Sequence, residues 1–280
     1  MARFYQANID FITEHAIDPD KRRYVDSLEG PRHFLDADHY GKRPFMKLPV
    51  KWDDAAKKYT ADTLAKYGTV PWQIQYEYYK LVIAFKEHDT TAILKTSANL
   101  GHYIADAHVP LHLTQNYNGQ LTHQDGIHAL WESRIPELFS DQYNYYVGQA
   151  RYIENPLNEA FKICRGSFKC VDSVLLFERR LNSTFPANKK YELVKHSGKK
   201  AMDYSVSYSK AYNTALKGMV ARRMRSAILE VGSFWFSAWV DAGQPDLNKL
   251  IEKPMYPEEK RKIQHEAILY KSGKMFTLSK

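Results

Sequence analysis

The sequence is poor in cysteine, modest in glycine and proline, and without long apolar runs. Its 280 residues include two cysteines, Cys164 and Cys170. So few thiols exclude a disulfide framework and a cysteine-based zinc finger, and any metal ion must use nitrogen and oxygen ligands. The pair could close a small loop in an oxidising compartment or stay as two reduced thiols near a helix end. No apolar stretch is long enough to cross a bilayer, and no charged-then-apolar leader is evident, so we expect a soluble chain.

Aromatic residues are abundant, since 20 Tyr, 13 Phe and 5 Trp stand against 13 Gly and 12 Pro. This balance favours a packed core and long helices over a sheet with many tight turns. We see neither an internal repeat nor a domain linker. The sequence therefore predicts an all-α fold, a single-domain helical bundle over residues 1–280.

The chain carries 40 Lys and Arg against 32 Asp and Glu. A basic protein favours an anionic partner such as nucleic acid, a phospholipid surface or a phosphorylated small molecule. A cationic surface that only maintains solubility explains the charge equally well.

Apolar residues return every three or four positions in several segments, which predicts helices there. The predicted helices cover residues 2–15, 53–67, 72–88, 90–107, a start near 127, 156–164, 171–183 and 203–241. Residues 113–125 are polar and rich in turn formers, and the lysine-rich stretch 186–200 is expected to be a mobile loop.

Histidine is concentrated in one stretch, because five of the eleven histidines fall between His102 and His128. His102 and Asp106 are four apart in a predicted helix, so both side chains project from one face. His128 and Glu132 repeat this spacing. A single pair is common by chance on a solvated helix face, but two pairs favour a metal site, and imidazole with carboxylate suits zinc.

His112 follows Pro110, where the chain leaves the helix and can turn the imidazole back toward Asp106. His108, six residues after His102, lies off that face and is expected at the surface or behind a ligand. Tyr103 and Trp131, beside predicted ligands, are expected to pack in the core rather than against a substrate.

The stretch from Gly101 to His112 is similar to the pattern His-x-x-x-Asp-x-x-x-Pro-x-His of a known superfamily, the zinc-dependent phospholipases C and the S1/P1 nucleases. His128 to Glu132 resembles its second His-x-x-x-Asp/Glu element. Upstream, Pro31 to Asp36 resembles the nuclease element Pro-x-His-Phe-Ile-Asp, and downstream Trp235 to Asp241 resembles the closing helix. Members are all-helical phosphodiesterases with three clustered zinc ions.

The resemblance implies a ligand set at matching positions. One zinc ion would be held by Asp18, which lies 15 residues before His33, together with His33, His102 and Asp106. A second would be held by His112, His128 and Glu132. A third is expected in the family, but its N-terminal Trp and nearby His have no counterpart here, so we expect a truncated N-terminus. A replacement role for His15 is disfavoured because it lies so close to Asp18.

Three residues are predicted to serve the reaction. Asp18 would orient the attacking water while binding metal, and Asp36 would act as an acid near the substrate or else merely fix His33 by a hydrogen bond. The resemblance implies that Asn116, close after His112, would contact the phosphate, because family members carry an Asn shortly after that histidine.

Glu132 matches the phospholipase form of the motif, so the predicted function is zinc-dependent hydrolysis of a phosphodiester, phospholipase C-like. The alternatives are an S1/P1-type nuclease that cleaves single-stranded nucleic acid and a helical metal- or lipid-binding protein with impaired catalysis. We further expect a monomer without a stable protein partner, contact with a membrane surface, and a secreted or periplasmic location implied by the resemblance.

Overall fold

The protein is mostly helical in the computed structural model, which describes residues 1–196, 199–251 and 261. A two-stranded hairpin is the only sheet within these ranges. The all-α prediction is thus confirmed at the level of fold class. The predicted single domain spans residues 1–280. Positions 197–198, 252–260 and 262–280 of it lie outside the described residues.

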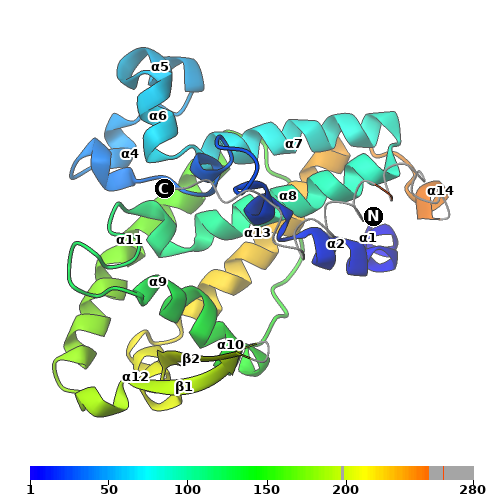
Figure 1. The fold of residues 1–280 in the computed structure, drawn as a ribbon. Helices are drawn as coiled ribbons and strands as arrows, with labels where there is room; N and C mark the ends of the chain where they lie inside the picture. Colours follow the sequence, from blue (N-terminus) through cyan, green and yellow to red (C-terminus); the bar gives the residue numbers. More distant parts are fainter. Residues whose placement is uncertain (197–198, 252–260, 262–280) are drawn as a thin grey trace.

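Four long helices build the body of the molecule (Figure 1), namely α7 (Val70–Glu87), α8 (Thr90–His108), α11 (Pro156–Asn182) and α13 (Met219–Asp241). The helices α7 and α8 lie side by side, and α13 packs against both. Tyr78 and Phe85 of α7, Ile104 of α8 and Phe234 of α13 are fully buried in the shared core. Burying a large apolar side chain contributes about 1.5–3 kcal/mol, so this core holds the helices in fixed relative positions.

Helix ends follow from local chemistry. The Asp89 carboxylate accepts a hydrogen bond from the Ala92 amide at the start of α8, and the Asn155 side chain caps α11, whose first residue is Pro156. Such residues satisfy backbone amides that have no partner inside the helix. Pro110 follows the end of α8 at His108 and prevents its continuation.

The N-terminal segment forms three short helices, α1 (Ala2–Ala7), α2 (Ile9–His15) and α3 (Asp18–Arg22), where one helix over 2–15 was predicted. Tyr5 stacks on Trp235 with ring centroids 4.4 Å apart, and its hydroxyl bonds to that of Ser97 on α8. Helices α2 and α3 both contact α8. This packing carries the Asp18–Arg22 helix to the side of α8 that bears His102.

The segment between α3 and α7 consists of short elements, η1 (Gly30–His33), η2 (Ala37–Tyr40), α4 (Pro44–Lys47), α5 (Trp52–Tyr59) and α6 (Ala61–Tyr67). The predicted helix over 53–67 is interrupted at Thr60, whose φ is 69°. The chain then passes close to η1, where the Thr69 amide donates to the Pro31 carbonyl and the Val70 amide to that of Phe34. Gly68, with a φ of 91°, sits so tightly there that a Cβ would lie 2.2 Å from the Phe34 oxygen.

The prediction of a mobile loop over 186–200 and of one helix over 203–241 was wrong. A hairpin of β1 (Tyr191–His196) and β2 (Lys199–Tyr204) pairs Leu193 with Met202, and residues 197 and 198 lie outside the described ranges. Ser205 then caps α12 (Val206–Ala215), and Gly218 in a left-handed conformation separates it from α13. Cross-strand side-chain pairs stabilise such a hairpin, and the many lysines hid its alternating pattern.

Helix α11 is one continuous helix of 27 residues, not the two predicted pieces over 156–164 and 171–183. Both cysteines lie inside it as free thiols. Six helical residues span about 9 Å along the axis, beyond the reach of a disulfide. Of the two alternatives for Cys164 and Cys170, the structure therefore has the reduced thiols.

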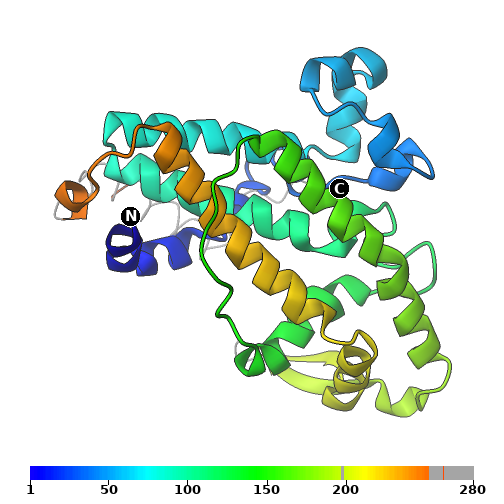
Figure 2. The ribbon, with the colours of Figure 1, turned by 180° about the vertical axis from the view of Figure 1, so that it is seen from behind.

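The remaining short elements are η3 (Pro110–Leu113), α9 (Ile127–Ala129), η4 (Leu130–Arg134), α10 (Ile135–Phe139), η5 (Ser140–Gln142), η6 (Ala187–Lys189) and α14 (Asn248–Ile251). Residues of η3, α9 and η4 pack with α12 in a second apolar cluster. The extended segment 143–155 runs across α13 to the start of α11 (Figure 2). The Ile153 amide in this segment donates a hydrogen bond to the Ser237 hydroxyl of α13. Within the described ranges, no helix combines the length and apolar character needed to span a membrane.

Candidate metal centre

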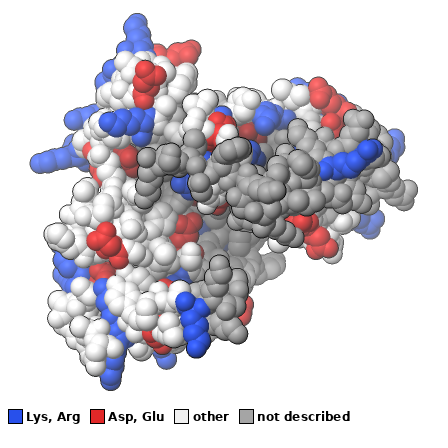
Figure 3. All heavy atoms as spheres, in the orientation of Figure 1, with Lys and Arg blue, Asp and Glu red and all other residues white. Residues whose placement is uncertain are grey.

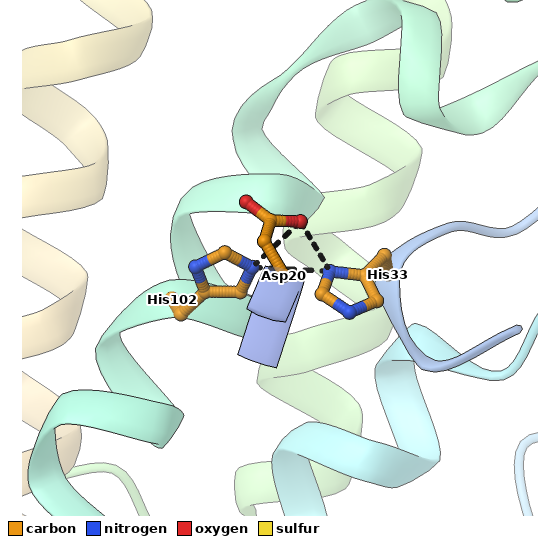
Figure 4. Close-up of side chains that lie close together, drawn as sticks. All are labelled: Asp20, His33 and His102. Carbon is orange, nitrogen blue, oxygen red and sulfur yellow. Dashed lines mark hydrogen bonds and ion pairs between the residues drawn. The ribbon is translucent and has the colours of Figure 1, made fainter. Parts of the chain in front are cut away.

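The first group of donor atoms comprises Asp20, His33 and His102 (Figure 4). They come from α3, η1 and α8 and meet because α3 and η1 pack against α8. His33 Nδ1 lies 3.0 Å from His102 Nε2, and Asp20 Oδ1 lies 3.7 and 3.9 Å from these two nitrogens. Both imidazoles are largely shielded from solvent, whereas Asp20 is half exposed.

Asp106 lies between the first group and the next. It follows His102 by one turn of α8, and its Oδ2 is 2.9 Å from His33 Nδ1 and 3.2 Å from His102 Nε2. Its other oxygen lies 3.6 Å from Nδ1 of His112. This buried carboxylate therefore faces three of the predicted histidine ligands.

The second group comprises His112, His128 and Glu132. His112 Nε2 lies 3.2 Å from His128 Nε2 and 3.4 Å from Glu132 Oε2, and the last two atoms are 2.6 Å apart. Glu132 belongs to η4, a π-helical turn that continues α9. Wide turns of this kind frequently occur at functional sites.

Hydrogen bonds fix how two of the imidazoles face the centre. His102 donates from Nδ1 to the Ala16 carbonyl at 2.8 Å, and His112 donates from Nδ1 to the His33 carbonyl at the same distance. In each neutral ring the proton is then on Nδ1, and Nε2 keeps a lone pair directed at the donor group. This arrangement is typical of histidines that bind a metal ion.

The donor atoms fit a small cation. In a tetrahedral site with bonds of 2.0–2.1 Å to nitrogen, neighbouring ligand atoms are ~3.3 Å apart. The donor-atom separations given above for the two groups, with Asp106 counted in the first, run from 2.6 to 3.9 Å. All the donors are imidazole nitrogens or carboxylate oxygens, a donor set that binds several divalent ions, zinc among them.

The charges are strongly coupled in the metal-free protein. Burial alone would lower the pKa of His112, but the charges of Asp106 and Glu132 outweigh it and raise the pKa to about 9. Burial would raise the pKa of Glu132, but hydrogen bonds from His112 and His128 lower it to about 2. The pKa of Asp106 falls well below its usual range through its three histidine neighbours, despite burial. Protons thus occupy positions that a metal ion would compete for.

A cavity of about 660 Å³ opens beside both groups. Its lining residues are Asp20, Arg23, His33, Phe34, Asp36, Asp106, Leu111, His112, Tyr117, His128, Glu132 and Ser133. Arg23 is the one Lys or Arg among them. The cavity therefore brings candidate metal-binding donors, a cation and the aromatic residues Phe34 and Tyr117 to one space.

The structure does not bring Asp18 to the metal centre. Its carboxylate pairs with His15 at 2.6 Å and with Lys21 at 2.7 Å, and Asp20 stands beside His33 and His102 instead. Asp18 and Asp20 are two residues apart on a helix, so they point about 200° apart around its axis. His15, considered as a replacement ligand for a third ion, contacts Asp18 and belongs to neither donor group.

Of the other two predicted site residues, Asp36 lies at the cavity and Asn116 does not. Asp36 lines the cavity, and burial, with the nearby charge of Asp38, raises its pKa to about 7. No hydrogen bond between Asp36 and His33 is present among the described residues, so its carboxylate is not used to fix that ring. Asn116 is buried within its own loop, where its amide bonds to Thr122 and Leu121, and it does not line the cavity.

Sequence reasoning missed Asp20, Arg23 and Tyr117. The clue to Asp20 was its place beside Asp18 in one short acidic run. His108 is buried, bonds to the Ile104 carbonyl and is not at the surface, while Tyr103 and Trp131 are core residues as predicted.

On the face drawn in Figure 3, the coloured Lys and Arg side chains do not gather into one basic patch. Among the residues drawn in colour in Figure 3, Lys and Arg are spread between Asp and Glu. The positive charge that can meet an anionic ligand at the cavity is therefore local, from Arg23.

No family model matches this chain, and no match to it is found among curated proteins.

Proposed function

We propose that this protein is a zinc-dependent hydrolase of phosphate esters, with a phosphodiester as substrate. One observation carries the proposal: two clusters of imidazole and carboxylate donors, linked by Asp106, open on one cavity that also holds Arg23. Two divalent ions in such a space would neutralise a phosphate group and activate water for attack on phosphorus. This chemistry needs no covalent intermediate on the protein.

The ions would be held by two sets of residues. Asp20, His33, His102 and Asp106 would bind the first ion, and His112, His128 and Glu132 the second. This set differs from the sequence prediction in one position, since Asp20 replaces Asp18.

Two other residues would serve the substrate. The Arg23 guanidinium, which lines the cavity and pairs with the Asp20 carboxylate at 3.6 Å, would bind a phosphate oxygen through charge-assisted hydrogen bonds. Asp36 lines the same wall and has a pKa raised to about 7, so its carboxyl group can give or take a proton near neutral pH. We assign it the proton transfer at the leaving or attacking oxygen.

A phospholipid is the substrate class we place first, because Glu132 resembles the phospholipase form of the motif. Single-stranded nucleic acid is the second, and one observation favours it: the Tyr117 ring lines the cavity, is half exposed, and could stack on a base. A protein that binds metal without catalysis is the third alternative.

Metal content tests the proposal first. Protein purified without chelator is expected to contain two zinc ions per chain by elemental analysis. His102→Ala and Glu132→Ala should each remove about one ion without unfolding the protein. His123→Asn is a suitable control, because it removes an exposed imidazole from the same stretch and its φ of 56° suits Asn. Fewer than two ions in the wild type, or unchanged content in both variants, would refute the ligand assignment.

Hydrolysis ranks the alternatives once metal is present. The zinc-loaded protein is offered a phosphatidylcholine analogue and single-stranded DNA at equal phosphodiester concentration. Preference for the first supports the phospholipase, and preference for the second supports the nuclease. Two bound ions without hydrolysis of either would leave metal binding as the function.

A further inference from the structure

Glu29 lies directly behind one of the candidate metal ligands. The Nδ1 atom of His33 faces Asp106 and His102, and the opposite ring nitrogen, Nε2, faces Glu29 with 3.5 Å to Oε1. That nitrogen is buried and makes no hydrogen bond among the described residues, so the 3.5 Å ion pair with Glu29 is what faces it. The Glu29 side chain is itself fully buried. The His33 ring thus lies between the Glu29 carboxylate on one side and Asp106 and His102 on the other.

Three donors hold the Glu29 carboxylate in place. Arg32 donates to Oε2 at 2.7 Å, Arg22 at 3.3 Å, and the Tyr103 hydroxyl makes a short hydrogen bond to Oε1. Tyr103 is the residue next to His102 on α8. A carboxylate fixed by so many partners cannot turn away from the ring behind which it lies.

The partners of Glu29 also connect η1, which carries His33, to α8, which carries His102. Arg22 also donates to Asn99 and to the Tyr103 hydroxyl, both on α8. Glu29 comes just before η1, which carries His33. These hydrogen bonds therefore hold η1 against α8 next to the first donor group.

We propose that Glu29 is a positioning residue for the metal centre: it accepts the proton of His33 Nε2 and so keeps the lone pair of Nδ1 directed at the first ion. The inference rests on the proposed function only in requiring that a metal ion binds. An anionic acceptor behind an imidazole fixes its tautomer and increases its basicity as a ligand, and loss of such a partner typically weakens metal binding about 10–100-fold.

A purely structural role is the competing explanation, because Glu29 also neutralises two arginines. A matched control separates the two roles. Glu77 is another buried glutamate, on which the charges of Arg22 and Glu29 act, and its carboxylate accepts from Gln73 and Lys80. Among the described residues, it makes no hydrogen bond or ion pair with a histidine of either donor group. Glu29→Gln and Glu77→Gln both replace a buried carboxylate with an amide of equal size.

The test is the affinity of each variant for zinc, measured by competition with a chelator. Glu29→Gln is expected to bind the first ion about 10–100-fold more weakly and the second ion as the wild type does. Glu77→Gln should bind both ions normally. Equal weakening at both sites in Glu29→Gln, or the same loss in Glu77→Gln, would show a structural role and overturn the inference, as would an unchanged first site. A wild type that binds no zinc would instead refute the proposed function itself.

A measurement on the wild type covers the case in which Glu29→Gln fails to fold. Long-range nitrogen-15 spectra of the zinc-loaded protein report which ring nitrogen of His33 carries the proton. We expect the proton on Nε2 and the metal shift on Nδ1. A proton on Nδ1 overturns the inference.

Discussion

The two donor groups are built in different ways. The first draws Asp20, His33 and His102 from three elements separated by up to 82 residues, and its histidines are buried with 4% and 12% of their side chains exposed. The second lies within 21 residues of chain, and its histidines, His112 and His128, are 13% and 25% exposed. Tertiary packing thus fixes the first group in advance, whereas the second depends on the loop between η3 and α9. We expect the first ion to bind more tightly.

Removal of the shared carboxylate should have the largest effect. Asp106→Asn withdraws an anion from three histidines and is expected to weaken the first ion by more than ~100-fold, beyond what loss of a supporting partner costs. It should also reduce hydrolysis by at least as much. Glu132→Gln should affect mainly the second ion. Zinc titrations of both variants measure the difference, and equal losses would contradict the contrast between the groups.

A pair of aspartates tests which residue completes the first group. Asp20→Asn is expected to weaken the first ion by about tenfold or more, because the amide oxygen is a poorer ligand than a carboxylate. Asp18→Asn should leave both ions within about twofold of the wild type, since Asp18 pairs with His15 and Lys21. The reverse result in chelator competition would restore the ligand set predicted from the sequence.

Arg23 should matter for substrate more than for metal, because its 3.6 Å ion pair with the Asp20 carboxylate is exposed and contributes little. Arg23→Met is expected to raise KM for a phosphodiester about tenfold, equivalent to about 1.4 kcal/mol of lost phosphate binding. Zinc content should stay at two. Arg180→Met, an exposed substitution on α11, is the control in steady-state kinetics. A Michaelis constant unchanged by Arg23→Met would remove this residue from the substrate site.

The smallest expected effect concerns Asp36 in the metal-free protein. Its folded-state pKa of about 7 lies above the ordinary value of 3.8, so the folded chain holds this proton more tightly than the unfolded chain. Its contribution to stability is complete below pH ~4 and is lost as the pH rises through ~7. The urea midpoint of the wild type relative to Asp36→Asn should therefore fall between pH 5 and pH 8. A difference that does not vary with pH would contradict the raised pKa.

Long periodic segments were predictable from the sequence, because a core-facing stripe such as that of α8 leaves a pattern over many turns. The pairs His102 with Asp106 and His128 with Glu132 were brought together as their spacing indicated. Local geometry alone fixes such contacts within one helix or helical turn. Their identification did not require knowledge of the fold.

Features set by tertiary packing were not predictable in the same way. Spacing along the chain pointed to Asp18, but the rotation of the short helix α3 against α8 turns Asp20 toward His33. Glu29 gave no signal, because its role depends on the approach of η1 to α8. Asn116 was predicted from the resemblance to a family that carries an Asn shortly after the matching histidine, and the loop uses its amide internally.

Gly68 shows how far the requirements of the centre extend. Because glycine has no side chain, the connection from α6 to α7 can lie against the carbonyl of Phe34, which is next to His33. Any larger residue would displace that backbone and, with it, a ligand. We therefore expect Gly68 to tolerate substitution as poorly as the candidate histidine ligands do. A mutational screen for loss of metal binding should then identify Gly68, although it does not line the cavity.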